Sequence, residues 1–145
     1  MILRKETEFE FLNFAFTIPK GVDIKGEINE GLCLTVQAPD EPWDVQICTL
    51  SRPYKIEEVF KDVEEQFTII SEREEAKHGN LNGCMIGYES ERYCYCEYQF
   101  EINGDERNRI LAIILEIPRE KKDKIGTMPI LTMVQAVTSL RKIEE

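Results

Sequence analysis

The only histidine of the chain is the first candidate for chemistry, because an imidazole can act as a base near neutral pH. His78 begins the stretch His-Gly-Asn-Leu-Asn-Gly, which is typical of a turn between two strands. A serine or cysteine hydrolase would need this imidazole beside a nucleophile. Cys84 is the nearest cysteine along the chain, and no other motif supports such a pair. We therefore expect His78 to be a surface turn residue and the chain to be non-catalytic.

The cysteines do not have the spacing of a metal site. Zinc sites usually contain cysteines separated by about two to four residues, together with two further ligands. Cys94 and Cys96 have a single residue between them. We expect reduced cysteines that behave as small apolar residues of strands, and neither a metal nor another cofactor. The five cysteines are Cys33, Cys48, Cys84, Cys94 and Cys96.

Acidic side chains are abundant, and their grouping predicts solvated surfaces. A glycosidase would need two carboxylates that face each other across a cleft. The acidic residues between positions 57 and 75 instead follow one side of an expected helix and the end of a strand. The chain has 28 acidic and 18 basic residues, which gives a formal net charge of −10. This charge repels nucleic acid and favours basic protein partners.

An alternating strand at residues 93–102 is the clearest structural pattern of the chain, and it contains Cys94 and Cys96. Its period of two is the mark of a strand that is buried on one face. The following segment, 110–117, is apolar at nearly every position, which predicts burial on both faces and helices on both sides of the sheet. One face of the first strand carries Cys94, Cys96, Tyr98, Phe100 and Ile102, and the other carries Tyr93, Tyr95, Glu97, Gln99 and Glu101.

The order of elements predicts a single α+β domain over residues 1–145 with a mostly antiparallel sheet of six or seven strands. Helices pack on this sheet, and the order is β-β-β-α-β-β-β-β-α. A turn is expected near Gly26, and the last helix should begin near Thr127. The apolar face expected for that helix contains Ile130, Met133, Val134, Val137 and Leu140. The expected strands lie near 14–18, 32–38, 43–47, 68–74, 84–90, 93–102 and 110–117, and the first helix lies near 56–67.

The faces of the two central strands predict the register of their hairpin. If Tyr88 lies opposite Cys94, a three-residue loop at 90–92 places all apolar side chains on one side. A two-residue loop would instead place Ile86 beside Glu97 and mix apolar and polar side chains. We therefore expect the three-residue loop.

The polar face of the 93–102 strand is the candidate binding surface. Tyr93 and Tyr95 offer apolar rings with a hydroxyl, which suit protein recognition, and Glu97, Met85 and Glu89 are expected beside them. The alternative is that a helix covers both rings as part of the core. A homodimer through the same surface is a further possibility.

Several segments resemble the PsbP-like fold family, which includes DcrB-like bacterial proteins and a Ran-binding nuclear import factor. They are Phe-Ala-Phe-Thr-Ile-Pro-Lys-Gly-Val at 14–22, the single Trp43, Leu-Asn-Gly at 81–83, and the final helix. The resemblance covers residues 9–143. It implies a non-enzymatic binding role, because similar bacterial domains are exported lipoproteins or cytoplasmic adaptors and chaperones for secreted effectors.

The N-terminal sequence has no apolar region of an export signal, and no apolar run reaches the ~20 residues of a membrane span. We therefore expect a cytoplasmic protein without membrane insertion. The expected function is non-catalytic binding, as an adaptor, chaperone or immunity-type protein for a secreted partner. The alternative is a small-ligand carrier or enzyme with a pocket between sheet and helix.

Overall fold

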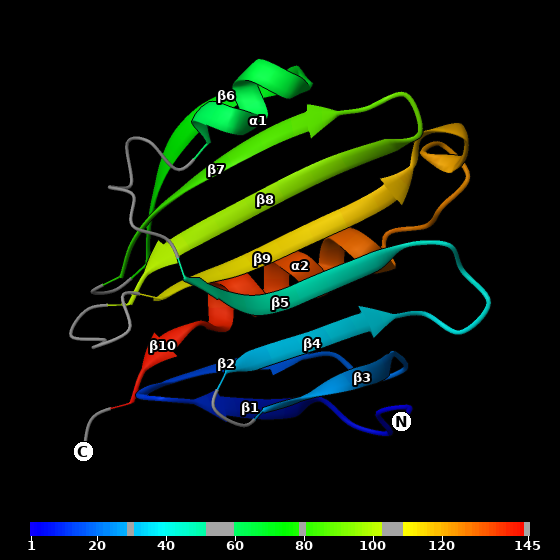
Figure 1. Cartoon of the computed structure of the whole chain (residues 1–145). Coiled ribbons are helices and arrows are strands. Elements are labelled where there is room, and N and C mark those ends of the chain that lie inside the picture. Colours follow the sequence, from blue (N-terminus) through cyan, green and yellow to red (C-terminus); the bar gives the residue numbers. More distant parts are fainter. Residues whose placement is uncertain (29–30, 52–59, 79–80, 103–108, 144–145) are drawn as a thin grey trace.

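Seven antiparallel strands form the main sheet of the computed structural model, which describes residues 1–28, 31–51, 60–78, 81–102 and 109–143 (Figure 1). The strands are β3 (Asp23–Ile28), β4 (Leu32–Gln37), β5 (Asp44–Ser51), β6 (Thr68–His78), β7 (Leu81–Glu89), β8 (Tyr93–Glu101) and β9 (Arg109–Pro118). Their order across the sheet is β3-β4-β5-β9-β8-β7-β6. The expected antiparallel α+β architecture is therefore confirmed.

A second, smaller sheet packs against one face of the main sheet. It consists of β1 (Thr7–Phe11), β2 (Phe14–Ile18) and β10 (Arg141–Lys142), in the order β1-β2-β10. Helix α2 (Met128–Ser139) packs on β2 of the small sheet and on β5 and β9 of the main sheet. We call this side of the main sheet the core face. The core includes Phe16, Ile18, Leu34, Val36, Val45, Ile47, Phe100, Leu111, Ile113, Met133, Ala136 and Leu140.

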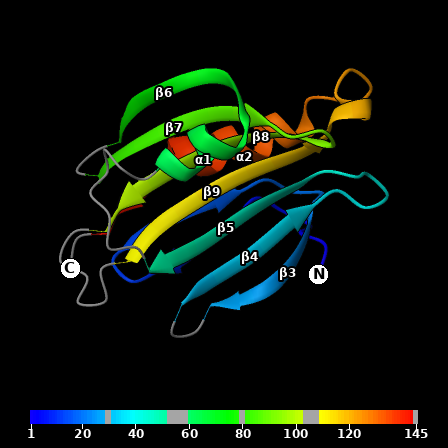
Figure 2. The ribbon, with the colours of Figure 1, turned by 45° about the horizontal axis from the view of Figure 1, so that its top comes forward.

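The opposite side of the main sheet, which we call the tyrosine face because it carries Tyr88 and Tyr95, packs against helix α1 (Lys61–Gln66). Phe60, Val63 and Phe67 flank or belong to α1 and pack on Ile86, Tyr88 and Ile110 in a second apolar cluster. Helices therefore cover both faces of the sheet, as the apolar segment 110–117 predicts. In Figure 2, α1 and α2 lie on either side of the strands. The beginning of the expected helix, 56–59, lies outside the described residues.

Helix α2 buries a different face from the expected one. Met133 and Leu140 are buried as expected, but Ile130 and Val134 are 55% and 43% exposed. The buried positions 129, 132, 133 and 136 begin one residue earlier than the expected apolar set. Thr132 can be buried because its hydroxyl donates a hydrogen bond to the carbonyl oxygen of Met128 at 2.7 Å.

The turn expected near Gly26 is wrong, because Gly26 lies inside strand β3 and pairs with Leu34. Its φ angle is +106°, a left-handed conformation that favours glycine. Strand β3 is a continuous edge strand, and β1, β3 and β10 are all absent from the expected order. The close approach of two backbones at Gly26 explains why a glycine occupies a strand.

Replacement of Gly26 by alanine should destabilise the fold, because its Cβ would lie 2.0 Å from the carbonyl oxygen of Cys33. We expect the free energy of unfolding to fall by about 2 kcal/mol, within the range for residues held in such conformations. Urea denaturation measures this change. Gly126→Ala is the matched control, since no atom lies within 4 Å of the added Cβ there. Equal effects of the two substitutions would contradict the assigned geometry of β3.

Candidate functional site

The hairpin between β7 and β8 has the register that the sequence analysis rejects. Glu89 pairs with Cys94, and Ile86 pairs with Glu97. The amide of Ser90 donates a hydrogen bond to the carbonyl oxygen of Tyr93 at 2.9 Å, which closes a two-residue turn. The expectation of a three-residue loop with Tyr88 opposite Cys94 is therefore wrong.

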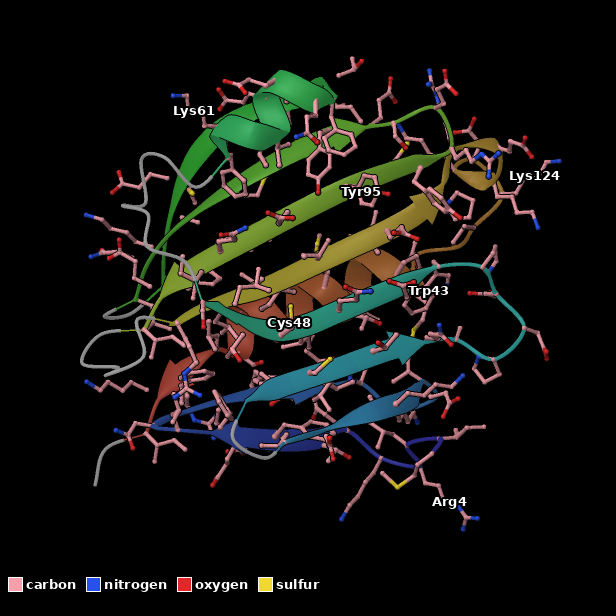
Figure 3. The ribbon with its side chains drawn as sticks, viewed as in Figure 1. Arg4, Trp43, Cys48, Lys61, Tyr95 and Lys124 are labelled. Carbon is pink, nitrogen blue, oxygen red and sulfur yellow. The ribbon has the colours of Figure 1, made fainter. Side chains whose placement is uncertain are left out.

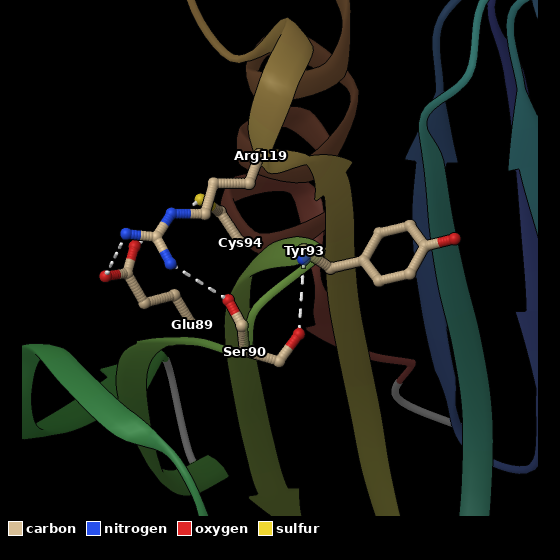
Figure 4. A network of polar contacts seen from close by, with 5 residues as sticks. All are labelled: Glu89, Ser90, Tyr93, Cys94 and Arg119. Atoms are coloured by element: carbon tan, nitrogen blue, oxygen red, sulfur yellow. Dashed lines mark hydrogen bonds and ion pairs between the residues drawn. The ribbon is translucent and has the colours of Figure 1, made fainter.

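This register divides the expected binding surface between the two faces of the sheet, since a shift of one residue exchanges the faces. Tyr93, Tyr95 and Glu97 lie on the tyrosine face, whereas Met85 pairs with Tyr98 on the core face. Glu89 is also on the far side and lies 3.4 Å from Arg119. Figure 4 shows the ring of Tyr93 pointing away from Glu89 and Arg119. The expectation that Met85 and Glu89 lie beside the two tyrosines is wrong.

The tyrosine face can bury the carboxylate of Glu97 because both of its oxygens accept hydrogen bonds. The hydroxyl of Tyr88 donates to Glu97 Oε1 at 3.1 Å, and Gln99 Nε2 donates to Glu97 Oε2 at 2.5 Å. Glu97 is only 6% exposed, and it therefore supports the face from within. Burial and the neighbouring carboxylate raise the pKa of Tyr88, so its hydroxyl stays a hydrogen-bond donor. Glu97 is thus a structural residue of this face.

The rings of Tyr93 and Tyr95 are partly covered and partly exposed. Tyr95 stacks on Tyr88 with 4.8 Å between ring centroids, and Phe67 beside α1 lies 6.1 Å away in an edge-on arrangement. Tyr93 lies 6.1 Å from Tyr95 and extends the aromatic cluster away from α1. Figure 3 shows Tyr95 on β8, on the side of the sheet that carries α1. Accordingly, both rings keep surface available for a partner.

Two carboxylates continue this cluster across the sheet. Tyr88 pairs with Tyr95, Tyr95 pairs with Glu116, and Glu116 pairs with Asp44 on strand β5. We call these four side chains the tyrosine–carboxylate row. The neighbouring Tyr95 hydroxyl lowers the pKa of Glu116, against the larger opposite effect of burial. The row therefore places an aromatic surface directly beside a pair of acids.

The two carboxylates of the row face each other without a counter-charge from the described residues. Burial, followed by the charge of Asp44, raises the pKa of Glu116 above its ordinary value. Burial also raises the pKa of Asp44, whose Oδ1 atom is buried without a hydrogen-bond partner. Among the described residues, no lysine or arginine forms an ion pair with either acid. Sequence analysis missed both residues, although Glu116 interrupts an apolar segment and could have been noticed.

The core face carries a second candidate site, an apolar groove of about 290 Å³ over strands β6 to β9. Met85 and Cys96 contribute to its floor, and Lys122 lies at its edge. Burial raises the pKa of the Cys96 thiol to about 11, so this cysteine stays protonated. The remaining lining residues are Ile70, Ser71, Gly87, Cys94, Tyr95, Leu115 and Ile117.

Within the described residues, no group of three or more histidine, cysteine or acidic side chains is placed to hold a metal ion. The side chain of His78 and the expected turn at 79–80 lie outside the described part of the structure. No helix in that part is long and apolar enough to cross a membrane.

Comparisons with known proteins identify the fold. No family model matches the chain, and no curated protein matches it in sequence. Among solved structures, a mutant of the protein Mog1 is similar, with 97% of each chain covered, a TM-score of 0.53 and 11% sequence identity. The likeness supports the PsbP-like fold that the sequence resembles, and it concerns the fold alone.

The raised pKa values predict that neutralisation of Glu116 stabilises the protein. A carboxyl with a raised folded-state pKa binds its proton more tightly when folded, so stability falls as pH rises from its ordinary pKa of 4.5 through the folded value. Glu116→Gln should therefore raise the free energy of unfolding at pH 7 by about 0.2–1 kcal/mol, the range for a cross-strand pair. At pH 4 the difference should be smaller, and urea denaturation at both values measures it.

Glu10→Gln is the control for this experiment, because Glu10 is exposed on β1 and is no part of the row. It removes one negative charge from the same chain. A larger stabilisation by Glu10→Gln than by Glu116→Gln would show that general charge repulsion, rather than the opposed pair, determines the effect.

Proposed function

We propose that the protein is a non-catalytic binding module that holds a basic segment of a partner protein on the tyrosine–carboxylate row. The observation that supports this most directly is the pair of Asp44 and Glu116. These acids lie directly opposite each other with no cation from the described residues. Like charges in this position destabilise a sheet, so a cation from another molecule would relieve a cost that the free protein carries.

An arginine side chain suits this surface best. Its planar guanidinium presents several donors to carboxylates and can also stack on an aromatic ring. Tyr95 lies beside Glu116, and Tyr93 extends the aromatic surface along the same strand. A guanidinium near Glu116 would therefore meet both a carboxylate and the face of a tyrosine ring, which adds a cation–π contribution.

The charge of the whole chain favours the same class of partner. A net charge of −10 attracts basic proteins from a distance and accelerates their association at low salt. A two-fold homodimer centred on the row would instead bring four carboxylates together, which is unfavourable. We therefore place a different, basic protein first, in the role of adaptor, chaperone or immunity-type protein for a secreted partner in the bacterial cytoplasm.

A hexa-arginine peptide should bind this face weakly and in a salt-sensitive manner. We expect the amide resonances of β8 and β9 around Tyr95 and Glu116 to shift during an NMR titration. Glu116→Gln should weaken the affinity by about fivefold, which corresponds to about 1 kcal/mol. A hexa-glutamate peptide should cause no shifts.

Glu10→Gln again serves as the control. It should leave the affinity within about twofold, because it also removes one negative charge but lies outside the row. Equal weakening by both variants would mean that only the net charge attracts the peptide. Shifts confined to another surface would contradict the assignment of the row. Light scattering at several concentrations distinguishes a homodimer from the expected monomer.

Binding of a small apolar ligand is the second candidate function, and the groove on the core face favours it. Its volume of about 290 Å³ is close to the lower limit for ligand pockets, and its lining is mostly apolar. Lys122 at its edge offers a charge for an anionic end of the ligand. This candidate assigns a carrier role to the same fold, and its groove shares only Tyr95 with the tyrosine–carboxylate row.

Decanoate is a suitable probe for this second function. If the groove binds such ligands, NMR titration should shift the amides of Cys96 and Ile117, and Met85→Glu should abolish these shifts by placing a charge in the groove. Ile28→Glu adds the same charge to an exposed position of β3 and should have no effect. Unchanged spectra in the presence of decanoate would exclude this ligand class for the groove.

A further inference from the structure

Two cysteines lie directly opposite each other on neighbouring strands of the tyrosine face. Cys33 on β4 pairs in register with Cys48 on β5. In an antiparallel pair, opposed Cα atoms are about 4.5 or 5.5 Å apart, depending on which type of pair they form. Both values fall within the range of about 4.4–6.8 Å that disulfides require. The two sulfurs can therefore be joined without a change in strand register.

Exposure distinguishes Cys33 from the other cysteines, since Cys48 and Cys96 are both half-buried. All five are reduced in the structure; Cys33 is exposed and Cys48 is half-buried. Figure 3 shows Cys48 on the strand β5, away from helix α1. Cys84 and Cys94 are buried, so an oxidant in solution meets Cys33 first.

Other pairings of these cysteines are disfavoured by position. Cys84 lies in the same cross-strand row as Cys48, but strands β9 and β8 stand between them. Three strand spacings correspond to about 14 Å, which is too far for a disulfide. Cys94 and Cys96 lie two positions apart on β8, and successive same-face residues are about 7 Å apart, beyond the disulfide range. Cys33 and Cys48 are thus the pair that the fold brings together.

We propose that Cys33 and Cys48 form an intramolecular disulfide when the protein meets a peroxide. The thiolate of Cys33 attacks one peroxide oxygen, and the O–O bond breaks to give a sulfenic acid on Cys33 and water. The thiolate of Cys48 then attacks the Cys33 sulfur, and the S–O bond breaks to release a second water. In total, two thiols lose two protons and two electrons, and one hydrogen peroxide takes them up to become two molecules of water.

The disulfide would fasten β4 to β5, next to the edge strand β3. The link closes the segment between positions 33 and 48, which includes the connection from Gln37 to Asp44. A closed segment restricts the unfolded chain, so the oxidised protein should unfold at a higher urea concentration than the reduced protein. This inference does not depend on the proposed partner, because Cys48 lies four residues along β5 from Asp44 of the row.

Peroxide treatment of the full chain tests the proposal directly. After treatment, the remaining thiols are alkylated and the protein is digested with trypsin. Cys33 and Cys48 fall within one expected tryptic peptide, 26–55, whereas Cys94 and Cys96 fall within 93–107. We expect peptide 26–55 to lose two hydrogen atoms and to resist alkylation until dithiothreitol is added. The other cysteines should remain alkylated.

Single variants provide the controls. Cys33→Ser and Cys48→Ser should each abolish the mass loss in peptide 26–55, whereas Cys84→Ser should leave it unchanged. A stable sulfinic acid on Cys33, a disulfide between two protein molecules on a non-reducing gel, or an unmodified peptide 26–55 would each overturn the proposal. The wild-type mass measurement decides the question even if a serine variant folds poorly.

Discussion

The register of the β7–β8 hairpin is the constraint on which both surfaces of the main sheet depend. Side chains alternate between the faces of a strand, so a shift of one residue would exchange them. The hydrogen bond from Tyr88 on β7 to the buried Glu97 on β8 favours the observed register, and Gln99 gives the same carboxylate a second donor. Two further strand pairs extend the row. The pairing of β8 with β9 places Tyr95 beside Glu116, and the pairing of β9 with β5 places Glu116 opposite Asp44. The hairpin therefore adds Tyr88 to the row, and the pairing of β8 with β9 joins the aromatic part to the acids.

The elements with dense apolar patterns could be predicted from the sequence, because burial alone decides their type. Strand β9 is apolar on both faces, and helices cover both sides as expected. The small sheet was missed for two different reasons. Strand β1 has the alternation Thr-Glu-Phe-Glu-Phe, which is a readable signal, whereas β10 has only two residues and pairs with β2 from the other end of the chain. No local pattern reveals such a distant pairing.

The positions of the candidate-site residues could be predicted from the sequence only where polar side chains face solvent. Tyr93 and Tyr95 share a face with Glu97 as expected, but Glu97 and Gln99 are buried rather than exposed. The assumption that polar side chains avoid apolar neighbours therefore selected the wrong loop, and it moved Met85 and Glu89 to the wrong face. Asp44 and Glu116 form a pair only through the register of β5 against β9, which depends on the whole sheet. Sequence patterns describe single strands and carry little information on such pairs.

The acids of the row are best explained by something outside the chain. Strands β5 and β9 do not require charges here, since the neighbouring pair is Gln46 and Ile114. Burial and the charge of Asp44 both oppose ionisation of Glu116, whereas the neighbouring Tyr95 hydroxyl favours it. The carboxylate of Glu116 thus lies at a position where its negative charge is unfavourable. Proteins keep costly groups where binding uses them, and a cation from a partner would convert this cost into affinity.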